Sequence, residues 1–80
     1  MKSVTVYTKN NCPQCQMTKM VLDGEGVKYT VVNIEDDTDE GKKGYDFVVN
    51  ELELRSLPVV VVDGEEPFTG FQPEKLKELK

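Results

Sequence analysis

The residues whose types and spacing point most directly to chemistry are two cysteines, Cys12 and Cys15, which enclose Pro13 and Gln14. Proline suits the first turn of a helix, because the N–H that it lacks would be unpaired there in any case. That first turn presents free N–H groups and the positive end of the helix dipole. A thiolate at Cys12 is stabilised by both, which lowers the pKa of the thiol and favours its reactive form.

The spacing of the two cysteines predicts a dithiol that can form and break a disulfide. Residues three apart share one helix face, which brings the two sulfur atoms within bonding reach. One thiolate can attack a substrate disulfide, and the other can then resolve the mixed disulfide. We expect Cys12 to be the exposed, attacking thiol and Cys15 the more buried, resolving one. Lys9 either stabilises the thiolate further or is an ordinary solvated lysine, and the sequence leaves both readings open.

The main alternative for the cysteine pair is a metal site. Structural zinc takes four ligands, usually Cys and His, and this chain has two Cys and no His. A monomer would have to use carboxylates, so a four-cysteine zinc or iron–sulfur site shared by two chains stays open. Two inert core thiols are a further alternative, which the exposed character of Pro13 and Gln14 disfavours. A Cys-x-x-Cys beside a strand–helix–strand pattern favours redox chemistry over both.

Length and charge narrow the class of protein. Eighty residues predict one domain, spanning residues 1–80, and two cysteines exclude a multi-disulfide scaffold. Fifteen acidic against ten basic residues disfavour nucleic-acid binding; the acidic surface serves solubility or docking onto basic partners. We find no secretory leader pattern and no apolar run of membrane-spanning length. These features predict a cytoplasmic location without a membrane partner, where a Cys pair is kept reduced.

The elements around the motif are predicted from periodicity and from breakers. We expect a strand over residues 4–7, then a helix from Pro13 to the turn at Gly24 and Gly26. A second strand over 27–34 should run parallel to the first, because a helix connects them. The expected apolar stripe of the helix consists of Met17, Met20, Val21 and Leu22.

The second half of the chain is predicted to complete the order βαβαββα. Three aspartates in a polar loop over residues 35–43, Asp36, Asp37 and Asp39, are candidate N-caps for the helix that follows the loop. Proline at 58 forbids helix there, and Asp63-Gly64 is a hairpin signal. The predicted segments are a polar loop over 35–43, a helix over 43–52 with Tyr45, Val48, Val49 and Leu52 as its apolar residues, a strand over 59–62, an edge strand over 67–70 and a helix from Pro73 with Leu76 and Leu79.

Together, these motifs resemble a known family over nearly the whole chain. Cys-Pro-Gln-Cys after a first strand, with Leu57-Pro58-Val59-Val60 before a hairpin, resembles the glutaredoxin branch of the thioredoxin superfamily. Residues 68–74, Phe-Thr-Gly-Phe-Gln-Pro-Glu, are similar to the Trp-Ser-Gly-Phe-Arg-Pro-Asp signature of the NrdH-redoxins. The resemblance implies a thioredoxin/glutaredoxin fold, an α/β fold with a four-stranded mixed sheet flanked by three helices.

The resemblance also implies a function. NrdH-redoxins are dithiol–disulfide carriers that donate electrons to class Ib ribonucleotide reductase, and for this chain we expect a monomer without a bound cofactor or metal. NrdH-redoxins are recharged from NADPH by thioredoxin reductase. The chain departs from the family pattern in three places: Phe68 replaces Trp, Gln72 replaces Arg, and the segment over 36–44 is longer. These departures bear on which reductase is the partner more than on the chemistry of the cysteine pair.

Four further site residues follow from the resemblance. Pro58 should follow a cis peptide bond and face the cysteine pair, and Leu57 should offer backbone hydrogen bonds to an extended substrate. Thr69 and Gly70 should line the same substrate site. Glutathione-using members carry a Gly-Gly pair and polar residues at this place, so the bulky Phe71 argues against glutathione, unless it merely packs on Leu76. A glutathione-dependent glutaredoxin is the alternative to a carrier recharged by a reductase.

Overall fold

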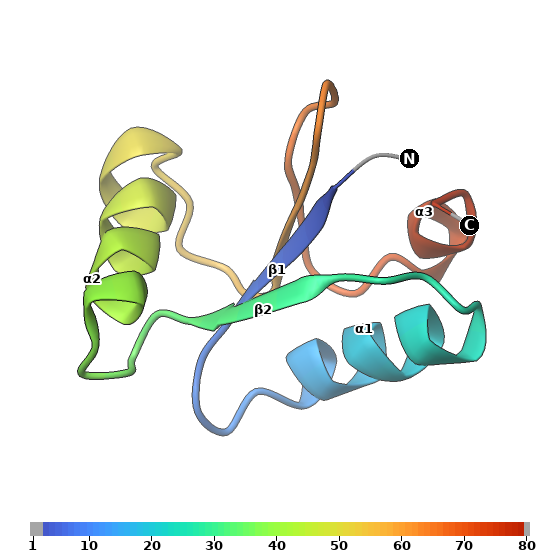
Figure 1. Cartoon of the computed structure of the whole chain (residues 1–80), viewed down its shortest axis with the longest axis horizontal. Helices are drawn as coiled ribbons and strands as arrows, with labels where there is room; N and C mark the ends of the chain where they lie inside the picture. The colour runs from blue at the N-terminus through green and yellow to red at the C-terminus, as the bar shows by residue number, and fades with distance from the viewer. Residues whose placement is uncertain (1–2, 80) are drawn as a thin grey trace.

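The structure is a computed structural model and describes residues 3–79. A four-stranded sheet in the order β2-β1-β3-β4 forms its centre (Figure 1). β2 is parallel to β1, whereas β3 is antiparallel to β1 and β4 to β3. The strands are β1 (Val4–Thr8), β2 (Thr30–Asn33), β3 (Val59–Val62) and β4 (Phe68–Thr69). The helices are α1 (Pro13–Gly24), α2 (Asp39–Tyr45), its π-helical continuation η1 (Asp46–Glu51) and α3 (Pro73–Lys77). The predicted mixed sheet with three flanking helical segments is confirmed.

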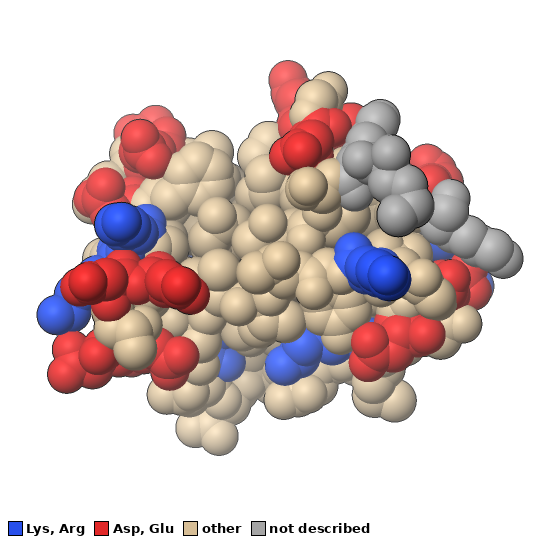
Figure 2. Space-filling model, in the orientation of Figure 1, with Lys and Arg blue, Asp and Glu red and all other residues tan. Residues whose placement is uncertain are grey.

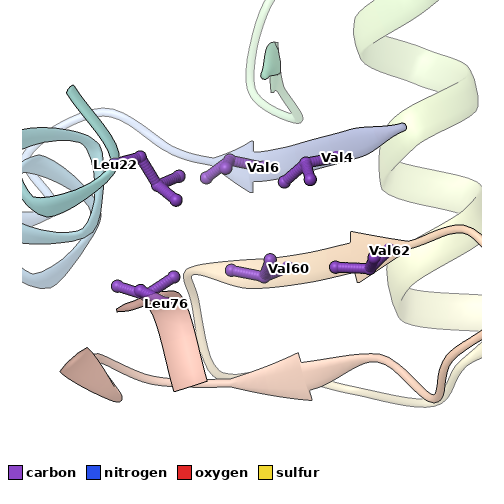
Figure 3. Close-up of a cluster of buried hydrophobic side chains, with 6 residues drawn as sticks. All are labelled: Val4, Val6, Leu22, Val60, Val62 and Leu76. Carbon is purple, nitrogen blue, oxygen red and sulfur yellow. The ribbon is translucent and has the colours of Figure 1, made fainter. Parts of the chain in front are cut away.

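One face of the sheet carries the main hydrophobic core, under α1 and α3. Alternate residues of β1 and β3 point to this face, as strand periodicity requires. Leu22 of α1 and Leu76 of α3 meet them from the helix layer, and both leucines are fully buried. Figure 3 shows this cluster, which consists of Val4, Val6, Leu22, Val60, Val62 and Leu76. The packing fixes α1 against the sheet and thereby positions the start of that helix.

The opposite face of the sheet is covered by α2 and η1, which approach it closely. A Cβ atom on Gly44 would lie 2.7 Å from Cγ1 of Val32, too near for a real contact. Val48 is buried here, and the ring of Phe47 lies 5.5 Å from that of Tyr7, centroid to centroid. Figure 1 shows α2 on one side of the sheet and α1 with α3 on the other.

The predicted apolar stripe of α1 is wrong in part. Met17 is 45% exposed and Met20 70% exposed, whereas the buried residues of the helix are Cys15, Thr18 and Leu22. Thr18 can be buried because its hydroxyl donates to the backbone carbonyl of Gln14, at 2.9 Å. The face that packs on the sheet is therefore rotated relative to the predicted one, and the two methionines face solvent.

The boundaries of the middle segments also differ from prediction. β2 begins at Thr30 rather than at 27, because the N–H of Val27 bonds the carbonyl of Leu22 and closes the end of α1. α2 begins at Asp39, inside the predicted loop. Its N-cap is Thr38 and none of the three aspartates, since the Thr38 hydroxyl accepts the N–H of Gly41.

The predicted helix over 43–52 is two segments of different winding. α2 ends at Tyr45 and η1 continues to Glu51, with a bond from the N–H of Leu52 to the carbonyl of Phe47, five residues back. Such wide turns are π-helical. Tyr45, expected on the apolar face, is 50% exposed. The hairpin turn at Gly64 (φ 78°) is confirmed, and the return strand covers only two residues. Within residues 3–79, no helix is long and apolar enough to span a membrane.

Candidate redox site

The two cysteines form a disulfide at the junction of β1 and α1. Cys12 is the N-cap of the helix, in extended conformation, and Pro13 occupies the first turn. Their Cα atoms lie 5.2 Å apart, and the backbone N–H of Cys15 donates to the Cys12 sulfur at 3.2 Å. After reduction, that N–H and the helix dipole favour a negative charge on the Cys12 sulfur.

The two cysteines differ in accessibility in the expected direction, but Cys12, which was expected to be exposed, is itself buried, because it caps α1 at its junction with β1. Cys12 is 7% exposed and Cys15 only 1%. An attacking thiol must reach a substrate sulfur, whereas a resolving thiol needs only to reach its neighbour. The arrangement can therefore perform thiol–disulfide exchange with Cys12 facing the substrate.

Leu57 and Pro58 lie at the same end of the sheet as the disulfide. β3 pairs with β1 so that Val59 lies opposite Tyr7, and the residues just before Val59 therefore lie beside the end of β1. The Leu57–Pro58 peptide bond is cis, as the resemblance predicted. Leu57 lies in no helix or strand, and none of the backbone hydrogen bonds found in the turns and loops of residues 3–79 involves it. Its N–H and C=O are thus available to an extended peptide.

Thr69 and Gly70 join this end of the sheet through β4. The N–H of Gly70 donates to the Pro58 carbonyl at 2.9 Å, and Thr69 pairs with Val59. Gly70 has a φ of 78°, a left-handed conformation that glycine adopts without strain. The structure therefore brings both residues beside Pro58, next to the backbone of Leu57.

Gln14, inside the cysteine motif, ties the redox loop to the turn after β4. Its Oε1 atom accepts the backbone N–H of Phe71 at 3.1 Å, across 57 positions of sequence. Phe71 itself is half-buried and packs against the core cluster that includes Leu76. Gln72, which replaces the signature Arg, donates from its side chain to the Thr69 carbonyl at 2.7 Å. The sequence indicated that Gln14 is exposed but gave no signal for its partner.

A second set of hydrogen bonds holds the loop just before Cys12. The carboxylate of Glu35 accepts the Asn10 N–H at 2.8 Å, and the Asn33 side chain donates to Asn10 Oδ1 at 2.9 Å. Asn11 follows with a φ of 55°, which Asn tolerates better than most residues. Sequence reasoning missed this network, since its partners come from the end of β2.

The geometry bears on Lys9 and on a metal site within a single chain. Lys9 is exposed, and no ion pair within residues 3–79 involves it, which matches an ordinary solvated lysine. Among the same residues, no three His, Cys, Asp or Glu side chains gather as metal ligands. A site shared between two chains would still need its third and fourth ligands from the partner.

Comparison with known proteins identifies relatives along nearly the whole chain. The sequence matches the Glutaredoxin family over residues 4–66. The glutaredoxin-like protein NrdH of Lactococcus lactis is 37% identical over 76 residues, which cover 95% of this chain and 97% of that protein.

Solved structures agree with the sequence comparison. NrdH-redoxin from Escherichia coli, a glutaredoxin-like protein with a thioredoxin-like activity profile, superposes with a TM-score of 0.80 at 28% identity, covering 98% of this chain and 95% of that one. A glutaredoxin from Archaeoglobus fulgidus gives 0.78 at 38% identity, with 99% and 86% covered. The disulfide at the start of α1, the fold and these relatives agree: this chain is a thiol–disulfide oxidoreductase that belongs to the glutaredoxin family and, within it, to the NrdH-redoxins.

Proposed function

We propose that this chain carries two electrons from NADPH, delivered by a thioredoxin reductase, to protein disulfides, with class Ib ribonucleotide reductase as the principal target. It acts in the cytoplasm as a monomer of one domain, residues 1–80, without a bound cofactor. The observation that carries the proposal is the turn after β4. There Phe71 packs on the core with its N–H held by Gln14, where glutathione-using relatives carry a Gly-Gly pair.

The exchange needs only the two cysteines and the substrate disulfide. In the reduced protein the Cys12 thiolate attacks one substrate sulfur, which breaks the substrate disulfide and releases its other sulfur as a thiolate. The Cys15 thiolate then attacks the Cys12 sulfur and releases the second substrate thiol. The products are a reduced substrate and the Cys12–Cys15 disulfide, which the reductase returns to the dithiol with two electrons and two protons.

Four neighbouring residues would hold the substrate segment during this exchange. The unpaired backbone groups of Leu57 support pairing with an extended chain, in the manner of an added β-strand. We expect Pro58, Thr69 and Gly70 to contact the substrate beside Leu57. The Gly70 N–H donates to the Pro58 carbonyl, which holds these residues together. We expect the substrate to lie along this edge, with its disulfide over Cys12.

A coupled assay tests the source of electrons. Consumption of NADPH is followed with insulin as the disulfide substrate, once with thioredoxin reductase and once with millimolar glutathione and glutathione reductase. We expect faster turnover with thioredoxin reductase. The Cys12→Ser variant should be inactive in both arms and serves as the blank. Ready reduction by glutathione, with no turnover by thioredoxin reductases from several sources, would instead identify a glutathione-dependent glutaredoxin.

The ribonucleotide reductase target needs its own measurement. A complete class Ib enzyme with its large subunit oxidised is mixed with a ribonucleotide substrate and the reduced protein, and the deoxyribonucleotide yield per added dithiol is determined. We expect one turnover per dithiol, and continuous turnover once reductase and NADPH are added. No yield above the Cys12→Ser blank would remove this target from the proposal, while leaving the insulin activity in place.

A further inference from the structure

The exposed face of α1 carries an apolar strip that begins at the redox motif. Pro13, Met17 and Met20, here called the methionine strip, follow one another at spacings of four and three, so they share one helix face. That face is opposite the one that packs on the sheet. Met17 is 45% and Met20 70% exposed, and they are two of the four large hydrophobic side chains that are exposed among residues 3–79.

The charge distribution sets this part of the molecule apart. Residues 1–22 contain three lysines and no acidic residue, whereas residues 23–80 contain all fifteen acidic residues and seven basic ones. Figure 2 shows acidic side chains over α2, at the top and at the right of the molecule, and few charged atoms along its lower edge, where the loop between β1 and α1 lies. One carboxylate, that of Glu35, does lie at the redox loop, where it accepts the Asn10 N–H. Lys19 lies on α1 between Met17 and Met20 in sequence, Lys9 precedes Cys12 by three residues, and the first acidic residue along α1 is Asp23, at the end far from the disulfide.

A protein that exchanges a disulfide with Cys12 can cover this strip in the same contact. A standard interface buries about 800 Å² on each partner, which corresponds to a disc of roughly 16 Å radius. Met20 lies seven residues beyond Pro13, which is about 10 Å along the helix axis. A footprint centred on Cys12 is therefore wide enough to include both methionines. Methionine side chains are flexible and polarisable, so they adapt to partners of different shape.

We propose that the methionine strip docks the proteins that exchange disulfides with Cys12, and that these partners present an apolar surface rimmed by carboxylates beside their reactive cysteines. This inference rests on the proposed exchange with protein disulfides and adds the chemistry of the partner surface. The apolar contact lies on Met17 and Met20. Lys9 and Lys19 attract the acidic rim, which raises the association rate at low salt.

The test compares protein partners with a small reductant. Met20→Glu is assayed with thioredoxin reductase and NADPH, with insulin, and with dithiothreitol, which needs no docking surface. We expect about a tenfold rise in KM, or an equal loss of kcat/KM, with the protein partners. The rate with dithiothreitol should not change, and Met20→Leu should behave as the unmodified protein. Raising the ionic strength should slow the unmodified protein with both protein partners.

A matched control comes from the other side of the molecule. Tyr45 is 50% exposed on α2, so Tyr45→Glu adds the same charge at another exposed large side chain outside the strip. It should leave every rate unchanged. Equal rates for Met20→Glu and the unmodified protein with both protein partners would overturn the docking proposal. If thioredoxin reductase fails on the unmodified protein while insulin is reduced, the proposed electron source is wrong, and the insulin arm alone decides on the strip. Exchange with dithiothreitol but with neither protein would overturn both.

Discussion

The two faces of the sheet are packed by opposite means. Under α1 and α3, large apolar side chains from both layers fill the space, as Leu22 and Leu76 do against the valines of β1 and β3 (Figure 3). Under α2, the helix comes so close that glycine replaces a side chain, and the Gly44 backbone lies against Val32. Removing side-chain volume should therefore destabilise the packing on the first face, whereas adding side-chain volume should destabilise the packing on the second. Chemistry is confined to the helix on the first face, at Cys12.

The largest effect should come from the cysteines, and only on exchange. Cys12→Ser removes the sulfur that meets the substrate, so insulin reduction should be abolished. Cys15→Ser keeps the attacking thiol but cannot resolve the mixed disulfide, so the covalent adduct with substrate should accumulate and be visible by mass spectrometry. Accumulation of the adduct with Cys12→Ser instead would reverse the two roles.

Removing volume from the first face should cost the most stability. Leu22 is fully buried in the main cluster, so Leu22→Ala should lower the free energy of unfolding by about 2–5 kcal/mol, measured by urea denaturation. Val31→Ala, at a position 43% exposed on edge strand β2, is the control and should cost well under half of that. Equal losses at the two positions would contradict the packing described for this face.

Adding volume to the second face should have a smaller effect. A Cβ atom at residue 44 would press on Cγ1 of Val32 and lie 3.4 Å from Ile34 and Tyr7, so Gly44→Ala should cost about 1–3 kcal/mol. Gly24, at the end of α1, has open space around its Cβ position. There Gly24→Ala should be neutral or stabilising by up to about 1 kcal/mol. A stabilising Gly44→Ala would show that α2 can move away from the sheet at no cost.

This contrast explains how far the sequence could predict the fold. Patterns made within one element were predictable: the strand–helix–strand start, Pro13 in the first turn, and the apolar run of β3. Distinctions that depend on packing were not. The helical period of α1 fits Met17 and Met20 as well as Cys15 and Thr18, and Thr18 is buried because its hydroxyl finds a carbonyl one turn back. No pattern within the helix explains Gly44, because the residue that its backbone approaches, Val32, lies on β2.

The site divides in the same way. The cysteine pair and the cis bond before Pro58 were predictable, because short motifs carry them. The bonds that hold the redox loop were not, since Gln14 meets the backbone of Phe71 and Asn10 meets Glu35, far along the chain. No local pattern distinguishes these two side chains from other exposed amides. Their roles follow only from the way in which the sheet brings the turn after β4 and the end of β2 to the redox loop.

The smallest expected effect concerns the pKa values of two tyrosines, one on each face of the sheet. On the α1 side, burial, a hydrogen bond to Asp23 (2.9 Å) and the negative charge of that carboxylate raise the pKa of Tyr29 from 10.0 to about 12. On the α2 side, burial alone raises the pKa of Tyr7. The folded state thus holds both phenol protons more tightly than the unfolded chain does. Their contribution to stability is complete below pH 10 and is lost as the pH rises towards 12.

The measurement is urea denaturation as a function of pH, with the tyrosinate absorbance followed in parallel. Tyr29→Phe should flatten the loss of stability between about pH 10 and 12, because the phenylalanine variant has no proton to lose there. Asp23→Asn should lower the pKa of Tyr29 only in part, since burial, the largest cause, remains. A full return to the usual tyrosine pKa in Asp23→Asn would assign the whole shift to the carboxylate. An unchanged pH profile in Tyr29→Phe would move the effect to Tyr7, on the other face of the sheet.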